Sequence, residues 1–410
     1  MKRLIFKYLS IICCMLAVSC TYEYNADIPS DTRIIIIDGR IVAGGNTVIS
    51  LSRAMTLNGT PVTSGFNASG IIECEDGSSI KGSVSTDESS QYSLVFDTHG
   101  IDQSKKYRVL IDAGQDGAFQ SDWLSIYEAP TIDKFSYEVV TDNGVRSLDF
   151  RVSAHSDVSP YFAVSYLEAW EHTALTTTRL EYFPETNQVA KASWSGHEHP
   201  YYRCWQKTDK EVIVISAAAH SEKKIEDAYL TKISQNDLKI SVLYRIIVNV
   251  TSTGKDYYEY WDNLRSISAI DGDLFTPIPS IMEGNVHRQS GDNLVIGFLG
   301  AGAAATDTLY YRNQGFYRRP KYLNDRLNEL LYYKDIEDAQ SDQDKYYCPL
   351  KAAWPSAYAE GNVPVMEILG PEGIIPDVYA WGKKQCVDCR YLGGDYTFPE
   401  DWPDRNDPNL

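Results

Sequence analysis

Short strand-like segments separated by turn-forming residues dominate the sequence from Arg33 to Pro130. Two of them, Tyr92–Phe96 and Tyr107–Ile111, alternate apolar with polar residues, as a strand with one buried face does. Clusters of Gly, Asn and Ser separate the segments at spacings close to those of a β-sandwich. The sequence therefore predicts an immunoglobulin- or transthyretin-like sandwich over residues 33–130. Its expected strands are Ile34–Ile37, Thr47–Ser52, Gly70–Cys74, Gln91–Phe96, Tyr107–Asp112 and Trp123–Tyr127.

A second β-rich region is predicted over residues 131–312, because strand-like segments continue after Pro130. The longest candidate, Asp237–Thr251, contains the alternating run Leu238–Ile246 and is expected to be a central strand. Other expected strands are Ser147–Ala154, Tyr161–Glu168, Glu211–Ser216 and Asn293–Leu299.

A helix is predicted within this second region, over residues 256–268, from the spacing of its aromatic and apolar residues. Its stripe consists of Tyr257, Tyr258, Trp261 and Leu264. Packing in the core is the expected role of such a stripe, and a platform for a ligand is the alternative.

The pattern changes again after Arg312. Residues 321–339 place Leu323, Leu327, Leu330 and Leu331 on one face, which predicts a second amphipathic helix. The rest of the chain is rich in Pro, Gly, Tyr and Trp and shows little periodicity. Residues 313–410 are therefore predicted to form a helix and an irregular region, which its cysteines could fasten to the second domain.

The first twenty residues are typical of a secretory signal. Lys2 and Arg3 precede an apolar run too short to span a bilayer, and small residues lead to Cys20. A cysteine at this point resembles the lipobox of bacterial lipoproteins, in which the cysteine is diacylated and becomes the new N-terminus. We expect a signal peptide over residues 1–19, lipidation at Cys20 and a polar tether over residues 20–32. The alternatives are an uncleaved helix and an ordinary secreted protein.

The formal net charge of −18 limits the classes of partner. Cleavage of the signal would remove three further cations and make the mature chain more acidic. Such a surface argues against nucleic acid and against an anionic membrane face as partners. The 29 tyrosines and 8 tryptophans suit core packing, and also surfaces that contact carbohydrate or peptide.

Several short motifs follow one another between Arg203 and Trp402. They are Arg203-Cys204-Trp205, Trp261-Asp262-Asn263-Leu264 with Pro277, Gly284-Asn285-Val286, Ile296-Gly297-Phe298, Cys386-Val387-Asp388-Cys389-Arg390, Gly393-Gly394 and Pro399-Glu400-Asp401-Trp402. Together with the lipobox and Asp38-Gly39, this set resembles the family called domain of unknown function 4249, over nearly the whole mature chain. The resemblance implies a Bacteroidota outer-membrane lipoprotein whose partner is a TonB-dependent transporter. It implies no activity, since none is established for the family.

Five cysteines follow Cys20, so at least one stays unpaired if the others form disulfides. The Cys386-x-x-Cys389 spacing suits a disulfide, a zinc site or a pair of free thiols. The disulfide interpretation makes Cys204 the expected partner of Cys386 or Cys389. Zinc would need two more ligands, for which the candidates are Cys204, Cys348 and the pair His197 and His199. The Gly-rich surroundings do not suit a thioredoxin-like motif.

No sequence signature assigns a catalytic residue, a cofactor or a metal ligand. His197-Glu198-His199 could share a metal if it lies on a strand, but an exposed loop is the simpler interpretation. Neither His-Glu-x-x-His nor a Gly-x-Ser-x-Gly turn occurs. Asp271-Gly272-Asp273 lacks the acidic ladder of a calcium loop and is expected to form a turn.

Three classes of function fit these observations. The first is a non-enzymatic outer-membrane lipoprotein that docks on, or captures a ligand for, a TonB-dependent transporter in nutrient uptake. The second is a secreted hydrolase, metal-dependent or not, with a cleft between the two β regions. The third is a structural or adhesion protein of the cell envelope. The lipobox and the family resemblance favour the first, whose ligand the sequence does not identify.

Overall fold

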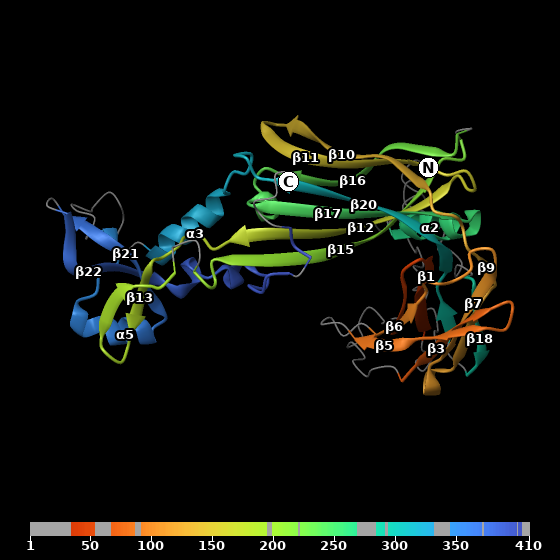
Figure 1. Ribbon diagram of the computed structural model, residues 1–410, viewed down its shortest axis with the longest axis horizontal. Helices are drawn as coiled ribbons and strands as arrows, with labels where there is room; N and C mark the ends of the chain where they lie inside the picture. The colour runs from red at the N-terminus through yellow and green to blue at the C-terminus, as the bar shows by residue number, and fades with distance from the viewer. Residues whose placement is uncertain are drawn as a thin grey trace, which may run out of the picture.

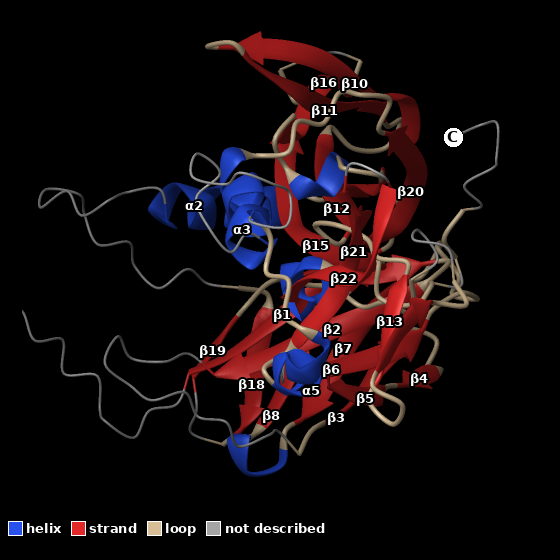
Figure 2. Cartoon of the chain, turned by 90° about the vertical axis from the view of Figure 1, so that its left-hand side faces the viewer, coloured by secondary structure: helices blue, strands red, loops and turns tan. Residues whose placement is uncertain are grey.

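A computed structural model describes residues 34–53, 67–86, 92–194, 199–219, 222–268, 284–291, 294–331, 345–370, 373–399 and 401–403. Within these ranges the chain is mainly β, as predicted, and its strands form several sheets (Figures 1 and 2). Residues 1–33, which hold the predicted signal, Cys20 and the tether, lie outside the described residues. So do His197, Glu198, Pro277 and the Asp271–Asp273 segment.

The first structural unit consists of two sheets that share one hydrophobic core. Its isoleucine-rich first strand buries Ile35, Ile37 and Ile41 completely, because β-branched side chains pack well on a pleated surface. Phe96 from the same sheet and Phe119 from the other both belong to this core. One sheet contains β1 (Ile34–Ala43), β2 (Asn46–Arg53), β6 (Tyr92–Asp97) and β5 (Ser83–Thr86). The other contains β18 (Val286–Ser290), β8 (Ala118–Ser121), β7 (Lys106–Asp112), β3 (Ser69–Cys74), β4 (Ser79–Lys81) and β9 (Leu124–Ser125). A 3₁₀ turn, η1 (Gly114–Asp116), precedes β8.

Three strands of this first unit come from much later in the chain than residues 33–130. β18 pairs with β8, and β19 (Leu294–Ile296) pairs in parallel with β1. The first part of β20 (Leu299–Arg312) also runs parallel to β1, from Leu299 to Ala303. Parallel partners need a long connection, so local sequence patterns do not reveal such a pairing. The structure thus adds strands after residue 284 to the first unit.

The second unit packs a four-stranded section of the large sheet against a three-stranded sheet. The section consists of β15 (Arg203–Ser216), β12 (Tyr161–Thr173), β17 (Leu243–Thr253) and the second part of β20; the smaller sheet consists of β10 (Thr131–Asp142), β11 (Val145–His155) and β16 (Lys224–Ser234). Phe150, Phe162 and Tyr244 are fully buried between them. Because β20 pairs with β1 at one end and with β17 at the other, it joins the two units through one continuous strand.

The central strand predicted from Asp237 begins later than expected. Residues Leu238–Ile240 form a 3₁₀ turn, η3, whose start is capped by the Asp237 side chain accepting a hydrogen bond from the Lys239 N–H. This local bond competes with strand pairing, so that part of the prediction is wrong. From Leu243 onward the strand pairs with β12 on one side and β20 on the other, which confirms its central place.

Helix α2 (Lys255–Ser268) lies where the sequence predicts a helix, and it packs against β15 and β12. Figure 1 shows it near the junction of the two units. Tyr257 is buried with Ala163 and Val214, so one side of the helix belongs to the core.

The C-terminal part forms a third group of elements at the far end of β12 and β15 (Figure 1). Residues 362–383, expected to be irregular, form a hairpin. Of the helix expected over residues 321–339, the structure describes the first part, α3. The elements are α3 (Lys321–Leu331), η5 (Lys351–Ala353), α5 (Trp354–Ala359), β21 (Asn362–Gly370), β22 (Gly373–Lys383), η6 (Lys384–Cys386) and η7 (Cys389–Leu392), together with the hairpin of β13 (Leu180–Phe183) and β14 (Gln188–Lys191). No helix in the described part of the chain is long and apolar enough to cross a bilayer.

Candidate functional site

A hollow of about 1240 Å³ lies between the first unit, helix α2 and the edge of the second unit. Strands β1 and β2 form one wall, which includes Asp38, Arg40 and Val48. Helix α2 forms another, and the C-terminal ends of β15 and the middle of β16 complete it. The hollow is therefore assembled from segments far apart in the sequence.

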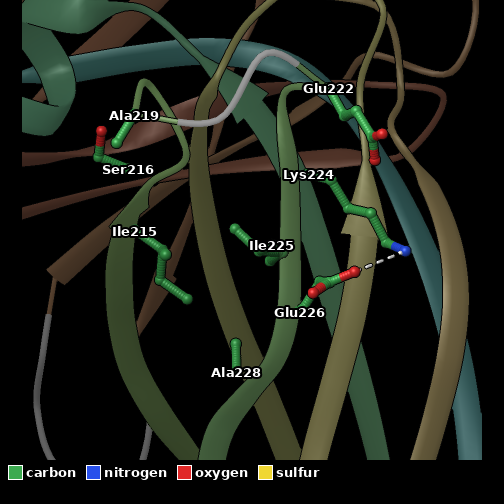
Figure 3. A pocket seen from close by; sticks show the side chains of 8 residues that line it. All are labelled: Ile215, Ser216, Ala219, Glu222, Lys224, Ile225, Glu226 and Ala228. Atoms are coloured by element: carbon green, nitrogen blue, oxygen red, sulfur yellow. Dashed lines mark ion pairs between the residues drawn. The ribbon is translucent and has the colours of Figure 1, made fainter.

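A second hollow of about 630 Å³ adjoins the first and lies between β15 and β16 (Figure 3). The two share Ile215, Ser216 and Ala228, so we treat them as one groove. In Figure 3 Ile215 and Ile225 come from the two neighbouring strands, while Lys224 and Glu226 form an ion pair of 3.1 Å. The part of the groove between β15 and β16 thus combines apolar side chains with the charged residues Glu222, Lys224 and Glu226.

The aromatic stripe of α2 belongs partly to the core, as expected, and partly to the lining of the groove. Tyr257 is only 3% exposed, and burial raises its pKa to about 12, as expected for a core phenol. Tyr258 and Trp261 are half-buried and line the groove, and Leu264 is 40% exposed at its side. The stripe therefore packs into the core on one side and presents an apolar wall to the groove on the other.

Arg40 lines the groove with part of its side chain. Its Nη1 atom is buried and makes no hydrogen bond to any described residue, so this atom does not itself face the space of the groove. The positive charge of Arg40 beside the aromatic wall suits a ligand with both polar and apolar groups.

The candidate cysteines are not brought together as a group. Cys204 and Cys389 form a disulfide with Cα atoms 5.7 Å apart, whereas Cys386 is a free, fully buried thiol. Burial raises the pKa of Cys386 to about 12 and that of Cys348 to about 11. Thiols with raised pKa values are poor nucleophiles, and Cys386 belongs to an apolar cluster with Val387 and Leu330. Because Cys204 and Cys389 are bonded to each other, neither is available as one of the zinc ligands that the sequence suggests.

The disulfide belongs to a clamp that holds the C-terminal segment on β15. Trp205 exchanges two backbone hydrogen bonds with Asp395, at 2.8 and 3.0 Å. Arg390 donates two side-chain hydrogen bonds to Asp388, which raise the pKa of the guanidinium. Its Cζ atom lies 3.8 Å from the centre of the Tyr201 ring. These contacts hold residues 388–395 against β15 and its preceding residues, which is a structural role.

Among the candidate histidines, only His199 falls within the described ranges. Its ring packs edge-on against Trp194 at 5.4 Å, and burial lowers its pKa. No group of three His, Cys, Asp or Glu side chains that could hold a metal ion occurs in the part of the chain that the structure describes.

A buried ionic group went unrecognised in the sequence. Glu168 is fully buried on β12; its carboxylate accepts hydrogen bonds from the Tyr244 hydroxyl and the Lys239 ammonium group, both at 2.8 Å. Burial and this neighbouring carboxylate raise the pKa of Tyr244 far above its usual range. The signal available was an acidic residue within an otherwise apolar strand. The group ties η3 to the sheet.

The model of one protein family, described as a domain of unknown function (DUF4249), matches residues 21–308. This chain belongs to the DUF4249 family. All residues that line the groove fall inside the matched range, whereas Cys389 falls outside it. In this DUF4249 protein the disulfide therefore links the family domain to the segment that follows it.

Comparison with other proteins adds little to the family assignment. No curated protein matches this DUF4249 chain. A crystal structure of a DUF4785 family protein from Legionella pneumophila is 8% identical, with a TM-score of 0.18. That match covers 52% of this chain and 50% of the other, so the chain spans about half the length of that protein. A likeness this weak carries no inference about function.

Proposed function

We propose that this protein is an outer-membrane lipoprotein that captures a ligand for a TonB-dependent transporter and is not an enzyme. The groove carries the proposal, because it joins the aromatic wall of α2 to the positively charged side chain of Arg40. Ligand sites are typically mostly apolar clefts with a few placed polar groups, often between domains. The lipobox-like segment ending at Cys20 supports the proposed location, and the family resemblance described above supports the proposed partner.

Anchoring is tested with the Cys20→Ser variant and metabolic labelling by an alkyne fatty acid. We expect the unaltered protein to carry the label and to fractionate with outer membranes, and the variant to lose both properties. Cys14→Ser is the matched control, since it removes a thiol from the same segment and should leave labelling intact. Equal labelling of the Cys20→Ser variant would refute lipidation at this residue.

The partnership is tested by purifying the tagged, lipidated protein from solubilised outer membranes and identifying bound proteins by mass spectrometry. The proposal predicts a TonB-dependent barrel in stoichiometric amount. Recovery of the protein without any barrel would contradict it.

A further inference from the structure

The protection of the β15 edge against further strand pairing differs along the strand. This strand lies at the end of the nine-stranded sheet, so one side of it has no neighbouring strand of that sheet. Near its start, Trp205 is covered through its backbone bonds to Asp395. The middle, Lys207–Glu211, is rich in charged residues and ends at a register shift opposite β12, two features that discourage strand pairing. In the last part, Ile213–Ser216, neither a charged run nor a register shift occurs, and no strand of the described ranges pairs with this edge.

The backbone groups of this last part point into the groove. Ala217 donates its N–H to the Pro160 carbonyl at 2.7 Å, which is the side of β12. Because N–H and C=O directions alternate along a strand, those of Ser216 and Val214 face away from β12. Both residues line the groove. The groove therefore contains a strand edge with donors and acceptors spaced to pair with another extended chain.

The surroundings suit the side chains of such a chain. Val48 is 46% exposed and Tyr229 is 51% exposed along the same groove, next to the apolar face of α2. Alternate side chains of a strand point to opposite faces, so an added strand would place every second side chain against these residues. Arg40 adds a positive charge to the same groove.

We propose that the groove binds an extended peptide, which adds as a strand to the Ile213–Ser216 edge of β15. Main-chain hydrogen bonds then provide affinity, and pockets for alternate side chains provide selectivity. The edge already accepts one segment of the chain itself at Trp205, so the bound peptide continues an interaction that the fold uses. The proposal commits to a free peptide as the captured cargo. It deepens the capture function and rests on it.

The probe is a pooled library of capped octapeptides with valine or threonine at alternate positions and lysine at both ends. The lysines keep the peptides soluble and complement the acidic protein. Peptides retained by the immobilised protein are identified by mass spectrometry, and the best is labelled with fluorescein for anisotropy titration. Its N-methylated form, blocked at the backbone positions that pair with β15, tests the hydrogen bonds without altering the protein. We expect binding to weaken by about ten-fold or more, the effect of about two lost hydrogen bonds.

Ser216→Pro tests the same main-chain hydrogen bonds by changing the protein and not the peptide. It removes an N–H that faces the groove and leaves the ladder to β12 intact, so we expect a similar loss of affinity. Ser216→Ala separates the two contributions, because it removes the hydroxyl and keeps the N–H; a loss of affinity as large as that of Ser216→Pro would contradict the role of the main-chain hydrogen bond. Hydrogen exchange should also show slower exchange at Val214 and Ser216 when the peptide is bound.

Two outcomes overturn the inference. One is that the library yields no retained peptide. The other is that the N-methylated and unmodified peptides bind equally well. If either occurs while the transporter still copurifies, the peptide inference fails and the partnership stands. If a segment of the transporter itself protects Val214 and Ser216 and no free peptide does, the groove is a docking site and the cargo inference is refuted.

Discussion

Removing the Cys204–Cys389 disulfide should destabilise the protein strongly while leaving ligand binding nearly unchanged. The bond joins the start of β15 to η7 across a separation of 185 residues. Both sulfur-bearing side chains are fully buried, and the Cys389 carbonyl lies 3.4 Å from Nε2 of buried His172. The change therefore affects the clamp on β15, far along the strand from the groove.

The size of the effect follows from the length of the closed loop. For a separation of 185 residues, the chain-entropy model gives about 5 kcal/mol of lost stability. Removal of native disulfides typically costs roughly 2–5 kcal/mol, so we take about 3 kcal/mol as the working value. For a unit of this size that corresponds to a fall in midpoint of about 10 °C.

The assay compares thermal unfolding of the oxidised protein with the Cys204→Ala/Cys389→Ala variant, followed by tryptophan fluorescence. Limited proteolysis is the second measurement, because release of the clamp should expose the segment after Cys386 to cleavage. Cys348→Ser is the matched control: it removes a thiol that takes no part in the disulfide and should leave the midpoint almost unchanged. Equal midpoints and equal proteolysis in the double variant would refute the clamp.

Three further predictions concern buried groups. Lys239→Met leaves the fully buried Glu168 carboxylate without its cation, so the free energy of unfolding measured in urea should fall by about 3 kcal/mol. The Lys239→Met/Glu168→Gln double variant should recover part of this stability. Additive effects of the two changes would contradict the prediction. Burial lowers the pKa of His172 below its ordinary 6.5, so below that pH the unfolded state binds more protons and stability falls by up to about 1.4 kcal/mol per unit of pH. A His172→Phe variant should lose that slope between pH 6.5 and 5.5, and an unchanged slope would show that another group titrates. Gly297→Ala would place a Cβ atom against a backbone carbonyl of β1 and should lower the free energy of unfolding by at least about 2 kcal/mol. Gly100→Ala is the control and should be neutral, because Gly100 has open space around it. Similar stabilities of the two variants would contradict the close packing of Gly297 against β1.

Local patterns were sufficient to locate many of the elements. Alternation identified β6 and β7, and helical spacing identified α2 within one residue at its start. Other elements carry weaker signals. β20 is rich in Gly and Ala because Gly300 packs against Tyr257 and Gly302 against Thr251, which leaves it with few residues of high β-propensity. The β21–β22 hairpin was missed because Pro364 and Pro376 weaken its pattern.

The groove could not be predicted as a site because its parts meet only in the folded chain. Arg40, Ser216 and Leu264 are separated by long stretches of sequence, and they come together through the parallel pairing of β1 with β20. The stripe on α2 was recognised, but whether it faces core or cleft depends on what packs beside it. The open edge of β15 likewise follows from the order of strands in the sheet, which local sequence does not encode.

Cryo-electron microscopy of the lipidated protein, purified from its native outer membrane, would show whether the groove serves a transporter. We expect a complex with a TonB-dependent barrel, in which the groove between β15, β16, α2 and β1 opens toward the mouth of the barrel. Particles without a barrel, or a complex in which the groove faces away from that mouth, would contradict capture of a ligand for transport.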